Sequence, residues 1–213
     1  GVSGMLYRDN LIPYDRHTLS NWSQMKGICI NGKLMGYEAE NTQLETTTYW
    51  LIKRAYPDAL ILDHEKCGDG ICTPLKSGND FGDPGDTTEL PTGNTYFGIA
   101  EGESLLLIDA SFFSASIYIY KSGFKRNQLI LVGDNENNYF ATFIIDKNLS
   151  GINFLPLQNR WPEIMKDTTG NVYDLFGNIT VDPAKASKLS SPVFYRAHTF
   201  AWQALFSDII IYN

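Results

Sequence analysis

A short segment near the start of the chain gathers the side chains best suited to binding or acid–base chemistry. Between Tyr14 and Gln24 it carries a carboxylate, a guanidinium, several hydroxyls and an amide. In one interpretation Arg16 binds an anion, Asp15 accepts protons or hydrogen bonds, and the segment lines a polar pocket. The candidate ligand-binding residues are Tyr14, Asp15, Arg16, Thr18, Trp22 and Gln24.

The same segment also fits a tight turn between two strands. Asp15 would then accept hydrogen bonds from backbone N–H groups at the bend, while Arg16 would pair with it or cover Trp22. Further along the chain, Asp167 stands in a matching place, but Thr168 replaces the arginine. An Asp in both segments favours the structural interpretation, and the loss of the Arg fits one functional and one degenerate copy. Both interpretations stay open.

Cysteines are the second candidate for chemistry. Cys67 and Cys72 are separated by four residues, and a disulfide between them would staple a region poor in apolar residues. Free thiols are one alternative, and a metal site with His64 is another, although zinc needs about four ligands. Cys29 lies in an apolar run and is predicted to be a buried free thiol.

An acidic, glycine-rich stretch is the third candidate. Asp80, Asp83 and Asp86 form a weak candidate calcium site, because calcium takes about six to eight oxygen ligands. Their spacing does not match an EF-hand loop, so a solvated acidic loop is the favoured interpretation. The sequence points to no other cofactor, since it contains no phosphate loop, no GxGxxG and no G-x-S-x-G nucleophile motif.

Composition limits the partners of the chain. Its 213 residues are 43% hydrophobic and 13% aromatic, which is typical of a globular protein. Seventeen Lys and Arg against 24 Asp and Glu give a net charge of −7, which disfavours nucleic acid as a partner. The most apolar region, Leu105–Tyr120, is interrupted by Asp109 and three serines and is shorter than the ~20 apolar residues of a membrane span. An unknown small molecule or protein remains as the expected partner.

Short runs rich in β-branched and aromatic residues, separated by turn signals, predict many strands. Two segments are predicted to be helical, Thr46–Tyr56, which ends before a proline, and Ala197–Phe206. Tyr118–Tyr120 fits a helix or a strand. The predicted strands are Gly4–Tyr7, Leu11–Asp15, Asn21–Met25, Leu60–Asp63, Tyr96–Ala100, Ser104–Ile108, Gln128–Val132, Tyr139–Ile145, Asn153–Leu157 and Asp208–Tyr212.

Two segments of the chain follow the same plan at an offset of about 150 residues. Residues 1–62 are predicted to be the back half of a first repeat unit, 63–94 a Gly- and Asp-rich loop or linker, and 95–213 a second unit packed on the first as one globular body. The expected fold is α+β, mainly antiparallel β-sheet built from two pseudo-repeat units that each carry one short helix. The matching positions are Gly1 with Gly151, Asp15 with Asp167, Trp22 with Tyr173, Gly27 with Gly177, and Ala55–Leu62 with Leu205–Tyr212.

The first 62 residues also carry motifs that resemble a prokaryotic family named domain of unknown function 3179. These motifs are Gly1-Val2-Ser3-Gly4-Met5-Leu6-Tyr7, Tyr14-Asp15-Arg16-His17-Thr18, Trp22-Ser23-Gln24 and Tyr56-Pro57-Asp58. Members of that family usually carry a Cys-Pro-Leu-Cys segment just before the first motif, and this sequence starts after it. The resemblance, together with the cysteine usage, implies an extracytoplasmic protein that is periplasmic, lipid-anchored or secreted.

These observations favour an extracytoplasmic binding or interaction module with a polar site near Tyr14–Gln24. One alternative is an enzyme whose site needs the upstream cysteines, and another is a structural or surface-assembly domain. The repeat and the resemblance both predict that a front half lies upstream of Gly1 or comes from another chain. Self-association, or association with that upstream segment, is therefore a further expectation.

Overall fold

Four small β-sheets and two short α-helices make up the part of the chain that the computed structural model describes, which is residues 2–8, 10–40, 45–60, 95–181 and 188–212. The strand orders are β1-β2-β3-β4, β13-β5-β6-β14, β7-β8-β9 and β10-β11-β12. Neighbouring strands run antiparallel, except that β14 runs parallel to β6. The prediction of a mainly antiparallel β fold with short helices is therefore confirmed.

The elements follow the chain in four groups. The first sheet contains β1 (Val2–Tyr7), β2 (Asn10–Asp15), β3 (Ser20–Ser23) and β4 (Ile28–Asn31). The second contains β5 (Thr95–Glu101), β6 (Ser104–Asp109), β13 (Phe194–His198) and β14 (Asp208–Tyr212). The last two contain β7 (Tyr118–Phe124), β8 (Asn127–Asp134) and β9 (Tyr139–Ile145), then β10 (Phe154–Pro156), β11 (Glu163–Asp167) and β12 (Val172–Asp174). The helices are α1 (Tyr49–Ala55) and α2 (Thr199–Gln203), with 3₁₀ turns at Ala110–Phe112 and Lys147–Leu149.

Strand β6 contributes to two cores at once, because successive side chains of a strand point to opposite faces. Leu105 and Leu107 pack with Trp202 of α2 on one face of the sheet. Leu106 and Ile108 pack on the other face against the β7-β8-β9 sheet. This explains why Leu105–Ile108 are all fully buried in an unbroken apolar run.

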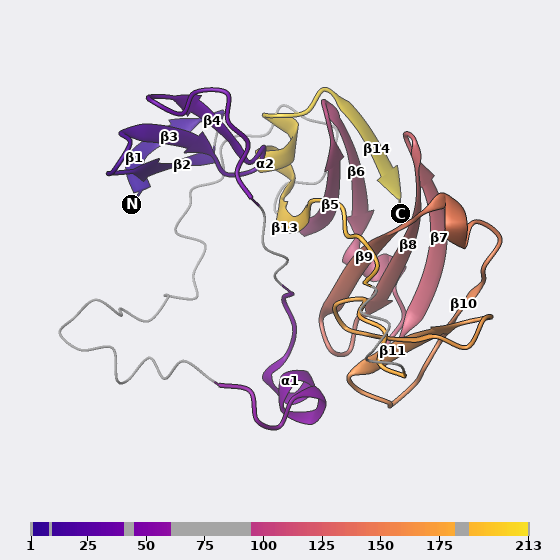
Figure 1. The fold of residues 1–213 in the computed structure, drawn as a ribbon. Helices are drawn as coiled ribbons and strands as arrows, with labels where there is room; N and C mark the ends of the chain where they lie inside the picture. Colours follow the sequence, from indigo (N-terminus) through magenta and orange to yellow (C-terminus); the bar gives the residue numbers. More distant parts are fainter. Residues whose placement is uncertain (1, 9, 41–44, 61–94, 182–187, 213) are drawn as a thin grey trace.

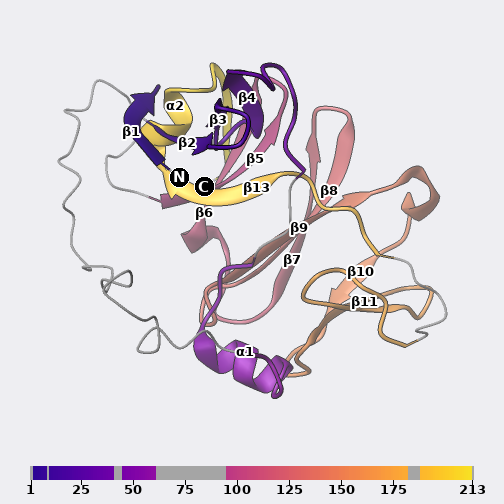
Figure 2. The same ribbon diagram turned by 60° about the vertical axis from the view of Figure 1, so that its left-hand side comes forward.

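Strand β8 also contributes alternate side chains to two cores, in the next layer of the molecule. Leu129 and Leu131 face the second sheet, whereas Ile130 and Val132 face a core that includes Leu51 of α1. The layers therefore follow one another from the first sheet and α2, through the two central sheets, to α1 and the β10-β11-β12 sheet. Figures 1 and 2 show the first sheet beside α2, and α1 at the other end of the molecule.

Helix α1 forms where the sequence predicts it, although it is shorter. The hydroxyl of Thr48 accepts a hydrogen bond from the backbone N–H of Leu51 at 3.2 Å and so caps the first turn. Leu51 and Ala55, one turn apart, are the buried residues of the helix. The second predicted helix is also present as α2, but its first two predicted residues, Ala197 and His198, belong to β13.

Most predicted strands are present, and several others were not predicted. Strands β4, β11, β12 and β13 lie in segments for which the sequence indicated no strand, and Tyr118–Tyr120 belongs to β7. Of the predicted strand Leu60–Asp63, only Leu60 lies within the described residues, and it is outside any strand.

The structure does not show the predicted repeat. The segment from residue 1 forms a four-stranded sheet of its own. The segment from residue 151 is divided between two sheets, since β10, β11 and β12 form one and β13 and β14 join the sheet of β5 and β6. Helix α1 packs in the core beside β8 and β9, whereas α2 packs in the core beside β5 and β6. Local features do agree, since Gly27 and Gly177 both have positive φ angles, of 62° and 79°. The repeat stays a prediction.

Candidate ligand-binding cleft

The segment from Tyr14 to Gln24 runs from the end of β2, through a bend, to the residue after β3. At the bend, Asp15 Oδ1 accepts a hydrogen bond from the backbone N–H of His17 at 2.9 Å. Its Oδ2 accepts from the Thr18 hydroxyl at 2.6 Å and from the Thr18 N–H at 3.3 Å. The bond from the Thr18 hydroxyl, followed by that from His17, lowers the pKa of the Asp15 carboxyl. These contacts are the ones that the turn interpretation predicts for Asp15.

Arg16 is exposed and turns toward Tyr14. Its Nε donates to the Tyr14 hydroxyl at 3.2 Å, and its guanidinium carbon lies 5.9 Å from the centre of the Tyr14 ring. Among the described residues, no ion pair joins Arg16 to Asp15. Trp22 is half-buried opposite Cys29 in the β3–β4 pair.

Asp167, the residue matched to Asp15 by sequence, also holds a turn. Its Oδ1 accepts from the N–H and the hydroxyl of Thr169 at 2.8 and 2.7 Å. Its Oδ2 accepts from the Tyr173 hydroxyl at 2.8 Å and from Asn171 Nδ2 at 2.9 Å. Burial raises the pKa of Asp167, but the hydrogen bonds from Thr169, Asn171 and Tyr173 outweigh it, so the pKa lies below its usual value.

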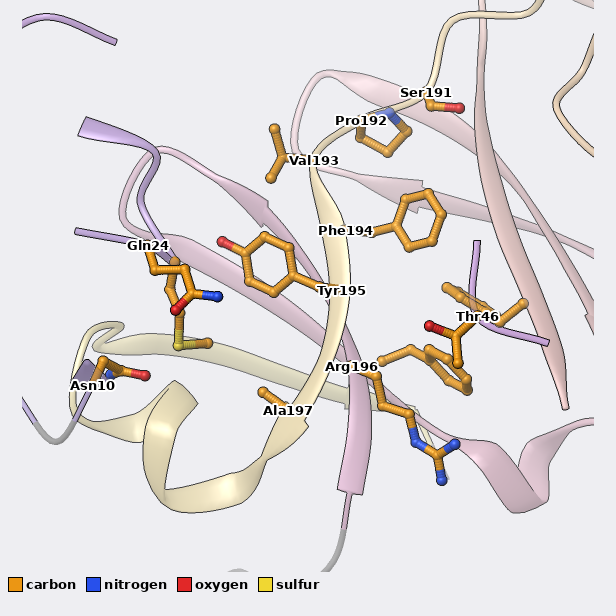
Figure 3. Close-up of a pocket in the computed structure, with 13 residues that line it drawn as sticks. Asn10, Gln24, Thr46, Ser191, Pro192, Val193, Phe194, Tyr195, Arg196 and Ala197 are labelled. Atoms are coloured by element: carbon orange, nitrogen blue, oxygen red, sulfur yellow. The ribbon is translucent and has the colours of Figure 1, made fainter. Parts of the chain in front are cut away.

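A cleft of about 530 Å³ lies near these residues, between the first sheet and strand β13 (Figure 3). It brings together the start of β2, the turn after β3, the segment before α1, β5, β9 and β13. Its walls combine aromatic and aliphatic side chains with a few polar ones. The lining residues are Asn10, Gln24, Met25, Thr46, Phe97, Phe140, Ser191, Pro192, Val193, Phe194, Tyr195, Arg196 and Ala197.

Tyr195 is the most distinctive polar residue of the cleft. Its ring stacks on the buried indole of Trp202, with centroids 5.1 Å apart and planes 4° apart. Its hydroxyl points toward Gln24 (Figure 3). The oxygen is buried and has no hydrogen-bond partner among the described residues. The same is true of Ser191 Oγ. Burial raises the pKa of the Tyr195 hydroxyl, so the group is a neutral donor and acceptor at neutral pH.

Arg196 supplies the positive charge of the cleft. One of its terminal nitrogens donates to Asn138 Oδ1 at 2.8 Å, and its guanidinium carbon lies 5.6 Å from the centre of the Phe97 ring. Within the part of the chain that the structure describes, Arg196 has no carboxylate partner. A guanidinium has five N–H donors, so most of them remain available to a bound group.

Of the six residues that the sequence singled out, Gln24 lines the cleft, and Tyr14, Asp15, Arg16, Thr18 and Trp22 do not. The sequence motifs did not point to Ser191, Tyr195 and Arg196, which lie far along the chain. The run Val193-Phe194-Tyr195 after a proline is typical of a strand, and that signal was available. The neighbouring helical pattern obscured it.

The other predicted sites lie largely outside the described residues. This applies to Cys67 and Cys72, to His64, and to the calcium candidates Asp80, Asp83 and Asp86. Cys29 is inside them, and it is a buried free thiol as predicted. In the described ranges no group of three or more His, Cys, Asp or Glu could hold a metal ion. In those ranges the helices are also too short or too polar to cross a membrane.

The fold and the cleft define a mostly antiparallel β protein with a partly apolar hollow beside the edge strand of its second sheet. Residues 1–69 match the model of a family described as "Protein of unknown function (DUF3179)". This match covers the Tyr14–Gln24 segment and α1, and it confirms the resemblance seen in the motifs. The chain has no significant match among curated proteins or among solved structures.

Proposed function

We propose that this chain is an extracytoplasmic binding module whose ligand occupies the cleft beside β13. One observation carries the proposal: a hollow of about 530 Å³ combines aromatic walls with two buried hydroxyls, on Tyr195 and Ser191, that have no partner among the described residues. Binding sites for small ligands typically have volumes of about 300–1,000 Å³, mostly apolar walls and a few well-placed polar groups.

The unpartnered hydroxyls favour a ligand energetically. Leaving a buried donor or acceptor unsatisfied costs about 1–3 kcal/mol, and a ligand that hydrogen-bonds to it recovers that cost. The walls formed by Met25, Phe97 and Phe140 favour an apolar body. The proposed ligand therefore has an apolar part and a few hydrogen-bonding groups.

The predicted polar site near Tyr14–Gln24 enters this proposal through Gln24. Asp15 holds the bend between β2 and β3, and β3 ends at Ser23, directly before Gln24. We infer that the turn contacts of Asp15 help to place the Gln24 amide opposite Tyr195. In this arrangement the segment positions one ligand-binding residue and otherwise acts as structure.

Binding is a better fit than acid–base catalysis for the lining residues described. Their ionisable side chains are Tyr195 and Arg196. General acid–base catalysis works best with a group whose pKa is near the operating pH, and the pKa of Tyr195 is raised away from neutrality. The cleft thus offers hydrogen bonds, apolar surface and one positive charge.

Protein-observed NMR with a library of aromatic carboxylic acid and amide fragments tests the proposal. We expect millimolar or tighter binders whose shift changes centre on Gln24, Phe194 and Tyr195. Thr46→Trp should block these changes, because Thr46 is an exposed residue of the cleft wall. Lys53→Trp is the matched control, because Lys53 is exposed on α1 outside the cleft. A library without any binder in the cleft would contradict the proposal, as would equal effects of the two tryptophans.

A further inference from the structure

The cleft runs along the edge of a β-strand. Residues 191–197 line it, and the last four of them belong to β13. Neighbouring side chains of a strand point to opposite faces, so a hollow on one face would touch only alternate residues. In Figure 3, Tyr195 and Ala197 lie on one side of β13, whereas Phe194 and Arg196 lie on the other. A hollow that reaches both sets must border the backbone of β13 itself.

This edge of β13 carries backbone groups that have no hydrogen-bond partner among the described residues. Strand β13 is the first strand of its sheet and pairs with β5 along its other edge. The N–H of Ala100 donates to the carbonyl of Val193 at 3.2 Å, which sets the alternation of the ladder. By that alternation, Tyr195 directs its backbone groups toward β5, while Phe194 and Arg196 direct theirs away from it. In the described part of the chain, no hydrogen bond to those outward groups is present.

The spacing of these groups matches an extended peptide. Phe194 and Arg196 are two residues apart, or about 6.8 Å along a strand, and a second strand repeats its own N–H and C=O groups at the same interval. A strand added to an open sheet edge gains affinity from such main-chain hydrogen bonds, and the pockets for its alternate side chains give specificity. The cleft is lined from both sides of β13, by Tyr195 and Ala197 on one side and by Phe194 and Arg196 on the other (Figure 3).

The charge of Arg196 indicates which side chain the partner peptide should carry. Arg196 lies on the Phe97 side and has no carboxylate partner among the described residues. On the other side of β13, the Tyr195 hydroxyl points toward Gln24 (Figure 3). Since side chains of an added strand alternate, one partner residue faces Arg196 and its neighbour faces the Tyr195 side.

We propose that an extended peptide segment of a partner protein adds to the outer edge of β13, opposite β5, with an Asp or Glu facing Arg196 and an apolar residue next to it. This inference rests on the binding function proposed above and names its ligand class. The main-chain bonds would be made by Phe194 and Arg196.

The test uses blocked seven-residue peptides that alternate Val and Thr around one central Glu. We expect binding that protects the Phe194 and Arg196 amides from hydrogen exchange. A peptide N-methylated at alternate residues keeps its side chains but loses main-chain donors, so it should bind at least about tenfold more weakly. A central Lys in place of Glu should also weaken binding, because it would face Arg196.

Two variants of the protein distinguish the contribution of the Arg196 guanidinium to peptide binding from that of the Arg196 backbone. Arg196→Ala should remove the preference for Glu over Lys but keep the sensitivity to N-methylation. Arg196→Pro should abolish binding, because it also removes the outward N–H, while proline at an edge position leaves the β13–β5 ladder in place. Circular dichroism and the amide spectrum report whether each variant is folded, and the N-methylated peptide gives the same test on the unmodified protein.

The outcomes distinguish this inference from the proposed function. If fragments bind in the cleft but the peptides do not, or bind equally well when N-methylated, the peptide inference is wrong and the binding function stands. If neither binds, both are wrong. If the Phe194 and Arg196 amides become protected as the concentration of protein alone rises, a second copy of the chain occupies the edge, and the proposed partner is wrong.

Discussion

Tyr195 stacks face to face on Trp202, with ring centroids 5.1 Å apart and planes only 4° apart. The contact joins the edge strand β13 to helix α2, and it fixes the orientation of the tyrosine ring. Trp202 is fully buried, so its indole is a fixed surface for the tyrosine ring. The stacking therefore holds a polar group in a position where nothing among the described residues hydrogen-bonds to it.

Tyr195→Phe should raise the free energy of unfolding by about 1–3 kcal/mol when no ligand is present, because it removes a buried hydroxyl that has no hydrogen-bond partner among the described residues. Tyr139→Phe is the matched comparison, since the buried Tyr139 hydroxyl donates to the carbonyl of Leu175 at 2.7 Å. That variant should lose about 1–3 kcal/mol. Urea denaturation of both variants measures the difference. Equal losses would mean that Tyr195 has a structural partner.

Gly98→Ala should disturb the stacking of Tyr195 on Trp202, because the added methyl group would collide with the indole ring. A Cβ on Gly98 would lie 2.4 Å from Cζ2 of Trp202, which is far inside van der Waals contact. Because the indole is fully buried and cannot move away easily, we expect a loss of about 1–3 kcal/mol. This corresponds to roughly 2–12 °C in Tm for a chain of this size.

Gly123→Ala is the control for this substitution. Gly123 also lies in a strand, but its Cβ would meet only the flexible end of Gln128, at 3.3 Å. The Tm of this variant should stay the same or rise slightly, because alanine restricts the unfolded chain. Equal losses at the two glycines would show that Trp202 does not account for the effect.

The sequence predicted those parts of the fold that depend on local pattern. The apolar run of β6 and the capped, amphipathic α1 are recognisable because burial and capping leave a signature within a few residues. The cleft could not be predicted in this way. It requires Arg196 to lie opposite Phe97, about a hundred residues earlier, and no local pattern encodes that register. The Asp15 segment was recognised because turn residues have strong local preferences, and these also made a turn hard to distinguish from a site.

Asp167→Asn should destabilise the protein in a pH-dependent way. The folded-state pKa of Asp167 lies below its unfolded value of about 3.9, because hydrogen bonds from Thr169, Asn171 and Tyr173 outweigh the opposing effect of burial. A carboxyl with a lowered folded pKa contributes stability above its unfolded pKa and loses it as the pH falls through the folded pKa. At pH 7 we expect a loss of about 1–3 kcal/mol, since the side chain is 3% exposed.

Measuring stability at several pH values tests this prediction for Asp167. Urea denaturation at pH 7, 5 and 3 should show a constant difference between the original chain and Asp167→Asn at the two higher values, and a smaller one at pH 3. Asp146→Asn is the control, because Asp146 is exposed and its side chain makes no capping hydrogen bond to the turn that follows. A difference for Asp167→Asn that is the same at all three values would contradict the assignment.

Alkylation should distinguish the three cysteines. Cys29 is 2% exposed and its Sγ lies 3.3 Å from the carbonyl oxygen of Asn31, so it should resist iodoacetamide in the folded protein. If Cys67 and Cys72 form the predicted disulfide, protein secreted into an oxidising compartment, then denatured without reductant, should gain one alkyl group by mass spectrometry. Reduction before alkylation should raise the gain to three, and Cys29→Ser should gain none without reductant. Three groups on the unreduced protein would rule out the disulfide and remove one support for an extracytoplasmic location, because stable disulfides form mainly outside the cytoplasm.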